Sequence, residues 1–136
     1  MTVVDAFPAV DAILADHAQA LGGDRAAYRN HVTRVLNFYL ALSGRPVVPE
    51  AVLIAGAFHD LGIWTHRTFD YLAPSMDLAC RHLSAIGRPE LDEEVRLGPS
   101  TGSIVQAATA RGIPHRRLTQ GSLVQFGWGS KQRRIQ

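Results

Sequence analysis

The sequence has a single cysteine, Cys80, among its 136 residues. One thiol cannot form an intrachain disulfide or build a cysteine-based metal cluster, so both are excluded and Cys80 is predicted to be a small core residue. Long apolar runs are also lacking, because charges, glycine or proline interrupt each one before the roughly 20 residues that a membrane-spanning helix needs. The first residues carry acids where a signal peptide has basic residues. The sequence therefore predicts a cytoplasmic protein with no membrane partner.

Acidic residues are absent after Arg96. Residues 1–96 contain 12 acidic and 8 basic residues, a balance of −4, whereas residues 97–136 contain 6 basic residues and no acid. Such asymmetry can indicate a nucleic-acid-binding tail, but here no nucleic-acid-binding motif accompanies it, so nucleic acid is not the expected partner. The change in composition instead predicts two parts, residues 1–96 and residues 97–136.

Apolar residues recur at helical spacing through residues 1–96, and helix-starting and helix-ending residues divide the pattern. The helix in "PEAVLIAGAFHDLG" is apolar on most sides, and it is predicted to be central and buried. The predicted helices begin near Pro8, Asp24, Pro49, Pro74 or Ser75, and Pro89.

Residues 97–136 show a different pattern. The stretch "GPSTGSIVQAATARGIP" predicts a helix with Ser100 or Thr101 as its N-cap. The stretches "HRRLT", "SLVQFG" and "KQRRIQ" predict short extended segments joined by turns. Gly127 and Gly129 lack the spacing of a phosphate-binding loop and are predicted to form a turn. The expected fold is therefore mainly α, a helical bundle followed by a helix and a short β-hairpin.

His59 and Asp60 lie side by side at the end of the central predicted helix, and a buried carboxylate is unfavourable unless it is paired or bound to a cation. Neighbours on a helix point about 100° apart, so these two can share a cation only beyond the helix end, where a residue of another helix meets it. His31 is the best-placed partner, because it shares the predicted inward face of its helix with Tyr28 and Leu42.

Two imidazoles and a carboxylate suit a divalent metal such as Mn, Fe, Zn or Mg, and water on such an ion becomes a nucleophile near neutral pH. Hydrolysis of a small-molecule phosphoester is the chemistry that these residues predict. The alternative is that His31 and His59 are hydrogen-bonded core histidines without a metal.

The stretches "YRNHVTRVLNFYLAL" and "AVLIAGAFHDLGIW" resemble the HD domain family of metal-dependent phosphohydrolases, and the resemblance extends over about residues 28–95. It implies an all-helical fold in which His31, His59 and Asp60 are three of the four usual metal ligands, with His59 and Asp60 in the catalytic centre. No residue matches the fourth ligand, an aspartate on a later helix. Asp70, Asp77 and Asp92 are the nearest acids, and the last two are expected on helix surfaces.

The stretch "WTHRTFDY" follows the histidine–aspartate pair. His66 and Arg67 are candidates for binding a substrate phosphate, because a cation there can act as an electrostatic clamp; the alternative is that both are ordinary loop residues. The aromatic residues around them, Trp64, Phe69 and Tyr71, are predicted to be packing residues. Three other histidines have no companion at ligand spacing and are expected in the surface or the core: His17, His82 and His115.

Within residues 97–136, "GPST", "RGIP" and "SLVQFGWGSKQRRI" resemble the opening part of the ATP-grasp region of the cyanophycin synthetase family, which are ATP-dependent amide ligases. The resemblance implies common ancestry, as a fusion or a truncated relative. It does not imply ligase activity, because the catalytic residues of that region would follow this segment. A second functional hypothesis is therefore a non-catalytic module that serves in interaction or in homo-oligomer formation.

Overall fold

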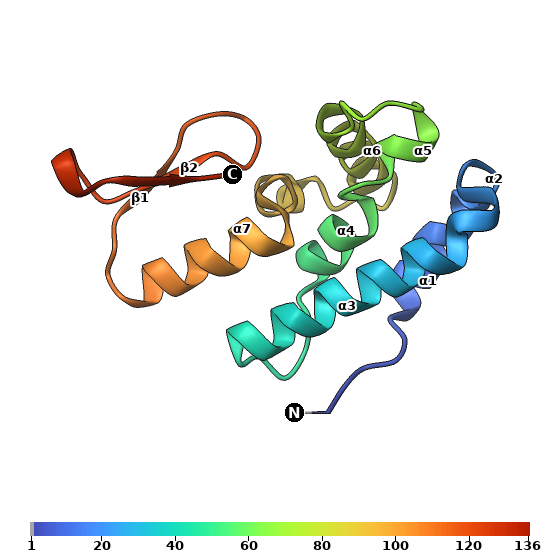
Figure 1. Ribbon diagram of the computed structural model, residues 1–136, viewed down its shortest axis with the longest axis horizontal. Coiled ribbons are helices and arrows are strands. Elements are labelled where there is room, and N and C mark those ends of the chain that lie inside the picture. Colours follow the sequence, from blue (N-terminus) through green and yellow to red (C-terminus); the bar gives the residue numbers. More distant parts are fainter. Residues whose placement is uncertain (1) are drawn as a thin grey trace.

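The computed structural model describes residues 2–136 and is mainly helical, with a small antiparallel sheet near the C-terminus (Figure 1). In chain order the elements are α1 (Pro8–Asp16), α2 (Ala18–Leu21), η1 (Gly22–Asp24), α3 (Arg25–Ser43), α4 (Glu50–Phe58), α5 (Gly62–Thr65), α6 (Leu72–Ala85), η2 (Pro89–Leu91), α7 (Asp92–Ala110), β1 (His115–Arg117), β2 (Val124–Phe126), η3 (Gly129–Lys131) and β3 (Arg133–Ile135). The prediction of a mainly α fold is confirmed.

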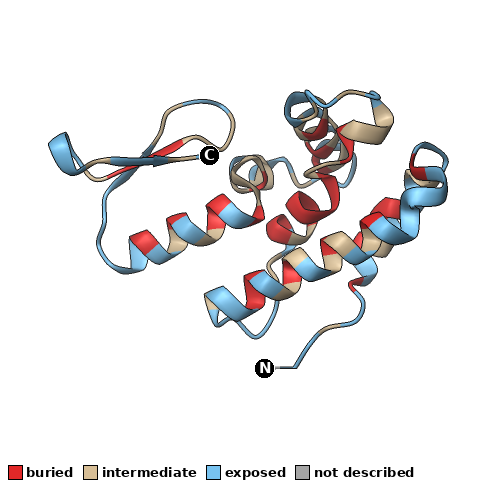
Figure 2. Cartoon of the chain, in the orientation of Figure 1, coloured by how far each residue is buried: buried red, intermediate tan, exposed pale blue. Residues whose placement is uncertain are grey.

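Helix α4 lies at the centre of the helical part and is buried along almost its whole length (Figure 2). Helices α1, α3, α6 and α7 each contact it. The larger hydrophobic core forms between these helices, and its fully buried side chains include Leu14, Leu36, Phe58, Leu61 and Leu83. The prediction that the "PEAVLIAGAFHDLG" helix is central and buried is confirmed, which explains why it is apolar on nearly every side.

The predicted helix starts agree with the structure within a few residues, and three details differ. The first helix is interrupted at His17, whose φ and ψ of −108° and 17° are not helical. The helix predicted from Pro74 or Ser75 begins at Leu72. Leu42, expected on the inward face of α3, is 80% exposed, because the last turn of α3 extends past the core.

Helix α7 bends at Gly98, whose φ of 73° lies in the left-handed region that favours glycine. The helix resumes at Pro99, and proline suits a first helical turn because its missing N–H would have no partner there. The prediction of an N-cap at Ser100 or Thr101 is therefore wrong, and Thr101 is instead buried within the helix. The bend lies two residues after Arg96, where the acidic residues stop.

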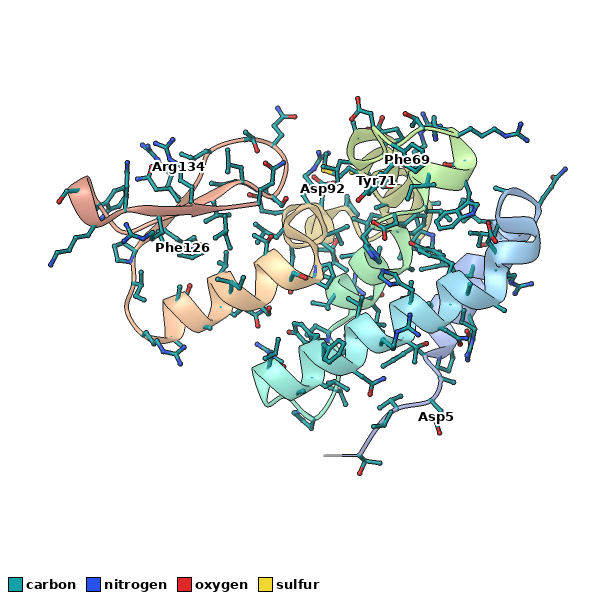
Figure 3. The ribbon with its side chains drawn as sticks, in the orientation of Figure 1. Asp5, Phe69, Tyr71, Asp92, Phe126 and Arg134 are labelled. Carbon is teal, nitrogen blue, oxygen red and sulfur yellow. The ribbon has the colours of Figure 1, made fainter. Side chains whose placement is uncertain are left out.

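The sheet has the order β1-β2-β3, so two successive hairpins extend the single hairpin that the sequence predicts. Val124 and Phe126 of the central strand pack with Val105 and Ala108 of α7 in a second, smaller hydrophobic cluster. Figure 3 shows Phe126 on the side of the sheet that faces α7 and Arg134 on the opposite side. The turn predicted at Gly127 is confirmed, since it joins β2 to η3 with a φ of 70°.

No helix within residues 2–136 combines the length and the apolar character needed to cross a bilayer.

Candidate metal centre

Three side chains from two neighbouring helices converge at one end of α4. His31 lies in the second turn of α3, His59 directly follows α4, and Asp60 is the next residue. The Nε2 atoms of His31 and His59 are 3.0 Å apart, and Asp60 Oδ2 lies 3.0 Å from His59 Nε2 and 3.4 Å from His31 Nε2. In the described part of the chain, these three form the one group of histidine, cysteine and acidic side chains with ligand atoms all within 4.8 Å of one another.

The orientation of His59 follows from the end of its helix. Its Nδ1 lies 2.6 Å from the carbonyl oxygen of Gly56, which can only accept a hydrogen bond, so Nδ1 donates. The neutral ring then has its lone pair on Nε2, which faces His31 and Asp60. A backbone partner on the remote nitrogen is the usual way in which proteins orient a metal-binding histidine.

The donor set fits a divalent cation. Two imidazole nitrogens and one carboxylate oxygen that face each other at 3.0–3.4 Å repel one another unless a proton or a cation lies between them. At metal–ligand distances of about 2.1 Å, neighbouring ligands in an octahedral or tetrahedral shell are roughly 3.0–3.4 Å apart. Mixed nitrogen and oxygen donors of this kind suit Fe, Mn or Zn.

Tyr28 holds the backbone around this centre. Its buried hydroxyl donates to the carbonyl oxygen of Ala57 at 2.9 Å and accepts from the backbone N–H of Asp60 at 3.3 Å. Its ring contacts Trp64 with centroids 4.9 Å apart, and the indole N–H of Trp64 donates to Asp24 at 3.0 Å. The predicted packing role of Trp64 is confirmed. The turn that carries Asp60 is thereby tied to α3.

The protonation states at the centre favour cation binding. Burial acts to raise the pKa of Asp60. The protonated form of His59, whose Nε2–H donates to Asp60, and the positive charge of the protonated imidazoles outweigh burial, so the pKa lies below its ordinary value. Burial and the neighbouring His59 and Arg34 lower the pKa of His31, although Asp60 opposes them. At neutral pH the carboxylate is therefore ionised and the His31 imidazole is neutral, the forms that bind metal.

Two glycines allow the close packing around the centre. A Cβ atom at Gly56 would lie 3.0 Å from Leu36 Cδ2, so the missing side chain lets α4 approach α3. A Cβ atom at Gly62 would lie 2.7 Å from the carbonyl oxygen of Tyr71. The backbone N–H of Gly62 also donates to the buried hydroxyl oxygen of Ser75 at 2.9 Å, which fixes α5 against α6.

A mainly apolar cavity of about 150 Å³ lies between α4, α6, the bend of α7 and three residues next to the sheet, Gly121, Ser122 and Gln136. His59 forms part of its wall, so the candidate metal centre borders it. Apolar side chains supply most of the remaining wall, among them Leu72, Met76, Ala79 and Val95. An apolar lining with few polar groups is typical of a small-molecule site.

The structure places the two candidate phosphate-binding residues on the loop after α5. His66 is exposed and its Nδ1 lies 2.8 Å from the Thr65 hydroxyl. Arg67, also exposed, has a φ of 50° and lines a surface pocket with Trp64 and Phe69. Neither belongs to the group formed by His31, His59 and Asp60 or lines the cavity beside His59.

Other sequence expectations fare differently. Phe69, expected to be a packing residue, is 91% exposed, and Figure 3 shows it with Tyr71 at the connection between α5 and α6. Cys80 is only partly buried and donates a hydrogen bond to Asp92, which also pairs with Arg96 at 2.6 Å. Asp92 is thus already engaged by groups outside the candidate centre. Two further aspartates, Asp70 and Asp77, are exposed, and His17 and His82 both pack their rings against Phe58.

Sequence reasoning did not assign roles to the residues that support the centre. Tyr28 precedes His31 by three residues, and this spacing on one helix face could have indicated their proximity. Gly56 precedes His59 by three residues, so its carbonyl lies within reach of the histidine ring at a helix end. The part played by Ser75 depends on the packing of α6 on α5, for which the sequence carries no signal.

Comparisons with known proteins support one of the two resemblances. The chain is 45% identical over 47 residues, 35% of its length, to a cyanophycin synthetase of Crocosphaera subtropica (strain ATCC 51142 / BH68). It is 50% identical over 40 residues, 29% of its length, to a cyanophycin synthetase of Geminocystis herdmanii (strain PCC 6308). Each match spans only 5% of the relative. No protein-family profile and no solved structure matches the chain. A short segment is therefore similar to cyanophycin synthetases.

Proposed function

We propose that the helical part of the chain is an HD-type, metal-dependent phosphohydrolase. The observation that carries the proposal is the convergence of His31, His59 and Asp60, with two donor distances of 3.0 Å and one of 3.4 Å. These residues would hold one divalent ion, of Mn, Fe, Zn or Mg. Such an ion supplies an activated water molecule and stabilises the negative charge that develops on phosphorus.

The chain's own groups have separate tasks in this proposal. Asp60 provides the ionised carboxylate, because its pKa lies below the ordinary value. His59 is held by the carbonyl of Gly56, and Tyr28 fixes the backbone of Asp60. His66 and Arg67 are proposed to meet the phosphate from the exposed loop after α5. In the reaction, water adds to phosphorus, the bond from phosphorus to the ester oxygen breaks, and the released alcohol takes up a proton.

The direct test is the metal content of the purified protein, measured by elemental analysis beside phosphatase activity. We expect about one equivalent of metal per chain and turnover that depends on it. A His59→Ala variant should lose both, and the control His115→Ala should keep both, because His115 is exposed on β1, outside the cluster. Wild-type protein that takes up no metal after incubation with Mn²⁺, Fe²⁺ or Zn²⁺ would refute the proposal.

A second candidate function is a non-catalytic interaction element related to cyanophycin synthetase. The similarity of a short segment to those ligases favours it. So does an apolar groove between α3 and α7, in which Phe38, Leu42 and Ile104 are 66%, 80% and 47% exposed. We infer that the chain is composite, with a junction near Leu97, where the charge changes sign and the larger core gives way to the smaller cluster.

The oligomeric state tests this second function. A homo-oligomer formed through the groove should dissociate in a Leu42→Ser variant. Ala41→Ser, on the same exposed turn but outside the lining of the groove, should leave it intact. Light scattering coupled to size-exclusion chromatography distinguishes the two results. A wild-type protein that stays monomeric at all protein concentrations measured, and that hydrolyses phosphoesters, would favour the phosphohydrolase function.

A further inference from the structure

The geometry points to an aryl phosphomonoester as the substrate, with its ring in the apolar cavity beside His59 and its phosphate at the cluster of His31, His59 and Asp60. This inference rests on the proposed phosphohydrolase function and adds the class of the organic group. It starts from the position of His59, which belongs both to the cluster and to the wall of the cavity. His31 and Asp60 do not line the cavity, so the proposed substrate would pass beside His59, with its phosphate at the cluster and its ring in the cavity.

The lining of the cavity selects an uncharged group. Leu72, Met76, Ala79 and Val95 contribute hydrocarbon surface, and burial of apolar ligand surface there is favourable by roughly 25 cal/mol per Å². Arg96 is the one guanidinium that lines this cavity, but its Nε already bonds Asp92 Oδ2 at 2.6 Å and its Nη2 lies 3.2 Å from Cys80 Sγ. Because Asp92 compensates the charge of Arg96, the cavity offers little electrostatic attraction to a phosphate. The phosphate of the proposed substrate is therefore placed at the cluster.

The volume selects the size of the group. The cavity measures about 150 Å³, and an apolar cavity of about this volume in another protein admits benzene. A single phenyl ring therefore fits, whereas a methyl group would leave most of the apolar wall without contacts. Hydrolysis of the phenyl ester would consume one water molecule and release phenol and inorganic phosphate, and the P–O bond to the ring oxygen is the one that breaks.

The first experiment compares phenyl phosphate with methyl phosphate, using protein reconstituted with Mn²⁺. Discrimination between groups in an apolar pocket is worth about tenfold or more, so kcat/KM should favour the phenyl ester by at least that factor. Ala79→Phe fills the cavity and should abolish most of this preference. The matched control is Ala85→Phe, because Ala85 is exposed on the same helix and does not line the cavity.

Two further measurements keep the test independent of folding defects and of turnover. Met76→Ala enlarges the cavity and should shift the preference from phenyl towards naphthyl phosphate. In metal-free protein, phenol should shift the NMR signal of the Ala79 methyl group, and it should do so equally in a His31→Ala variant, which lacks a metal ligand but retains the cavity.

The outcomes separate the two proposals. Equal kcat/KM for the phenyl and methyl esters, or no shift of the Ala79 signal with phenol, would overturn the cavity assignment and leave the phosphohydrolase proposal standing. Absence of turnover with every ester, in protein that binds Mn²⁺ and phenol, would instead overturn the proposed phosphohydrolase function. A preference for the phenyl ester that Ala79→Phe removes and Ala85→Phe retains would support both.

Discussion

The Nε2 atoms of His31 and His59 lie 3.0 Å apart, although 28 residues separate the two histidines in the chain. The rings of Tyr28, His31 and His59 form one group with centroids 5.1–6.3 Å apart. Because His31 lies on α3 and His59 at the end of α4, the proposed metal site depends on how these two helices pack. Substitutions that disturb that packing should therefore affect metal binding before they affect the fold as a whole.

Tyr28→Phe should weaken the centre without removing a ligand. It takes a hydrogen-bond donor from the Ala57 carbonyl and an acceptor from the Asp60 N–H, so we expect a loss of about 1–2 kcal/mol in the free energy of unfolding and a weaker affinity for Mn²⁺. Tyr39→Phe is the control, because its hydroxyl makes only a 3.4 Å contact with Gln106. Chemical denaturation and Mn²⁺ titration measure both effects. Equal losses in the two variants would contradict the role of Tyr28.

Gly62→Ala should destabilise the contact between α5 and α6. The new Cβ atom would lie 2.7 Å from the Tyr71 carbonyl oxygen and 2.9 Å from Ser75 Oγ, and overpacking of this kind costs about 1–3 kcal/mol. Gly23→Ala, where no atom lies within 4 Å of the added carbon, should change the free energy of unfolding by less than about 0.5 kcal/mol. Thermal or urea denaturation compares the two. An unchanged free energy of unfolding for Gly62→Ala would contradict the prediction, because it would mean that α5 and α6 move apart without cost.

Cys80 should react slowly with alkylating reagents at neutral pH. Burial, reinforced by its hydrogen bond with Asp92, raises the pKa of the thiol to about 11. Only about a thousandth of it is then thiolate at pH 8, and the thiolate is the reactive form. The rate of iodoacetamide modification, followed by mass spectrometry, should keep rising up to about pH 11. A plateau near pH 8.5, the ordinary thiol value, would contradict this environment.

Metal retention should extend to slightly acidic pH. Protons compete with the metal only when the pH falls to the pKa of the ligand, and the pKa of His31 is lowered, chiefly by burial and by His59. Bound Zn²⁺ should therefore remain at about pH 6.5, the ordinary histidine value, and be released as the pH falls further. Equilibrium dialysis across this range measures the release. Loss of half of the metal above pH 7 would indicate that His31 is not a ligand.

Much of the fold could be predicted from local sequence signals. Proline and apolar spacing indicate the helix starts to within a few residues, although within residues 2–136 no side chain makes a capping hydrogen bond at the start of a long helix. Helix α4 could be placed at the centre because it has no polar face. Leu42 was placed wrongly because periodicity gives a helix face but not the point at which neighbouring helices stop covering it. The bend at Gly98 was missed because Ser100 and Thr101 were interpreted as N-cap residues. Pro99, which occupies the first turn after the bend, was given less weight.

The candidate centre was predictable as a set of residues but not as a geometry. His31, His59 and Asp60 follow from one helix-end argument and one family resemblance, and the structure brings them together. Their supports come from Tyr28, Gly56 and Ser75, whose contacts depend on how helices pack across long sequence separations. The cavity beside His59 also depends on the position of α7, to which no sequence pattern points.

Gly56 influences the spacing of the candidate donors through the packing of two helices. Its missing side chain lets α4 lie close to α3, and His31 lies on α3 while His59 directly follows α4. An added methyl group, at 3.0 Å from Leu36 Cδ2, would push the helices apart and widen the opening between the donors. The spacing of the candidate donors thus depends on a residue that supplies none of them.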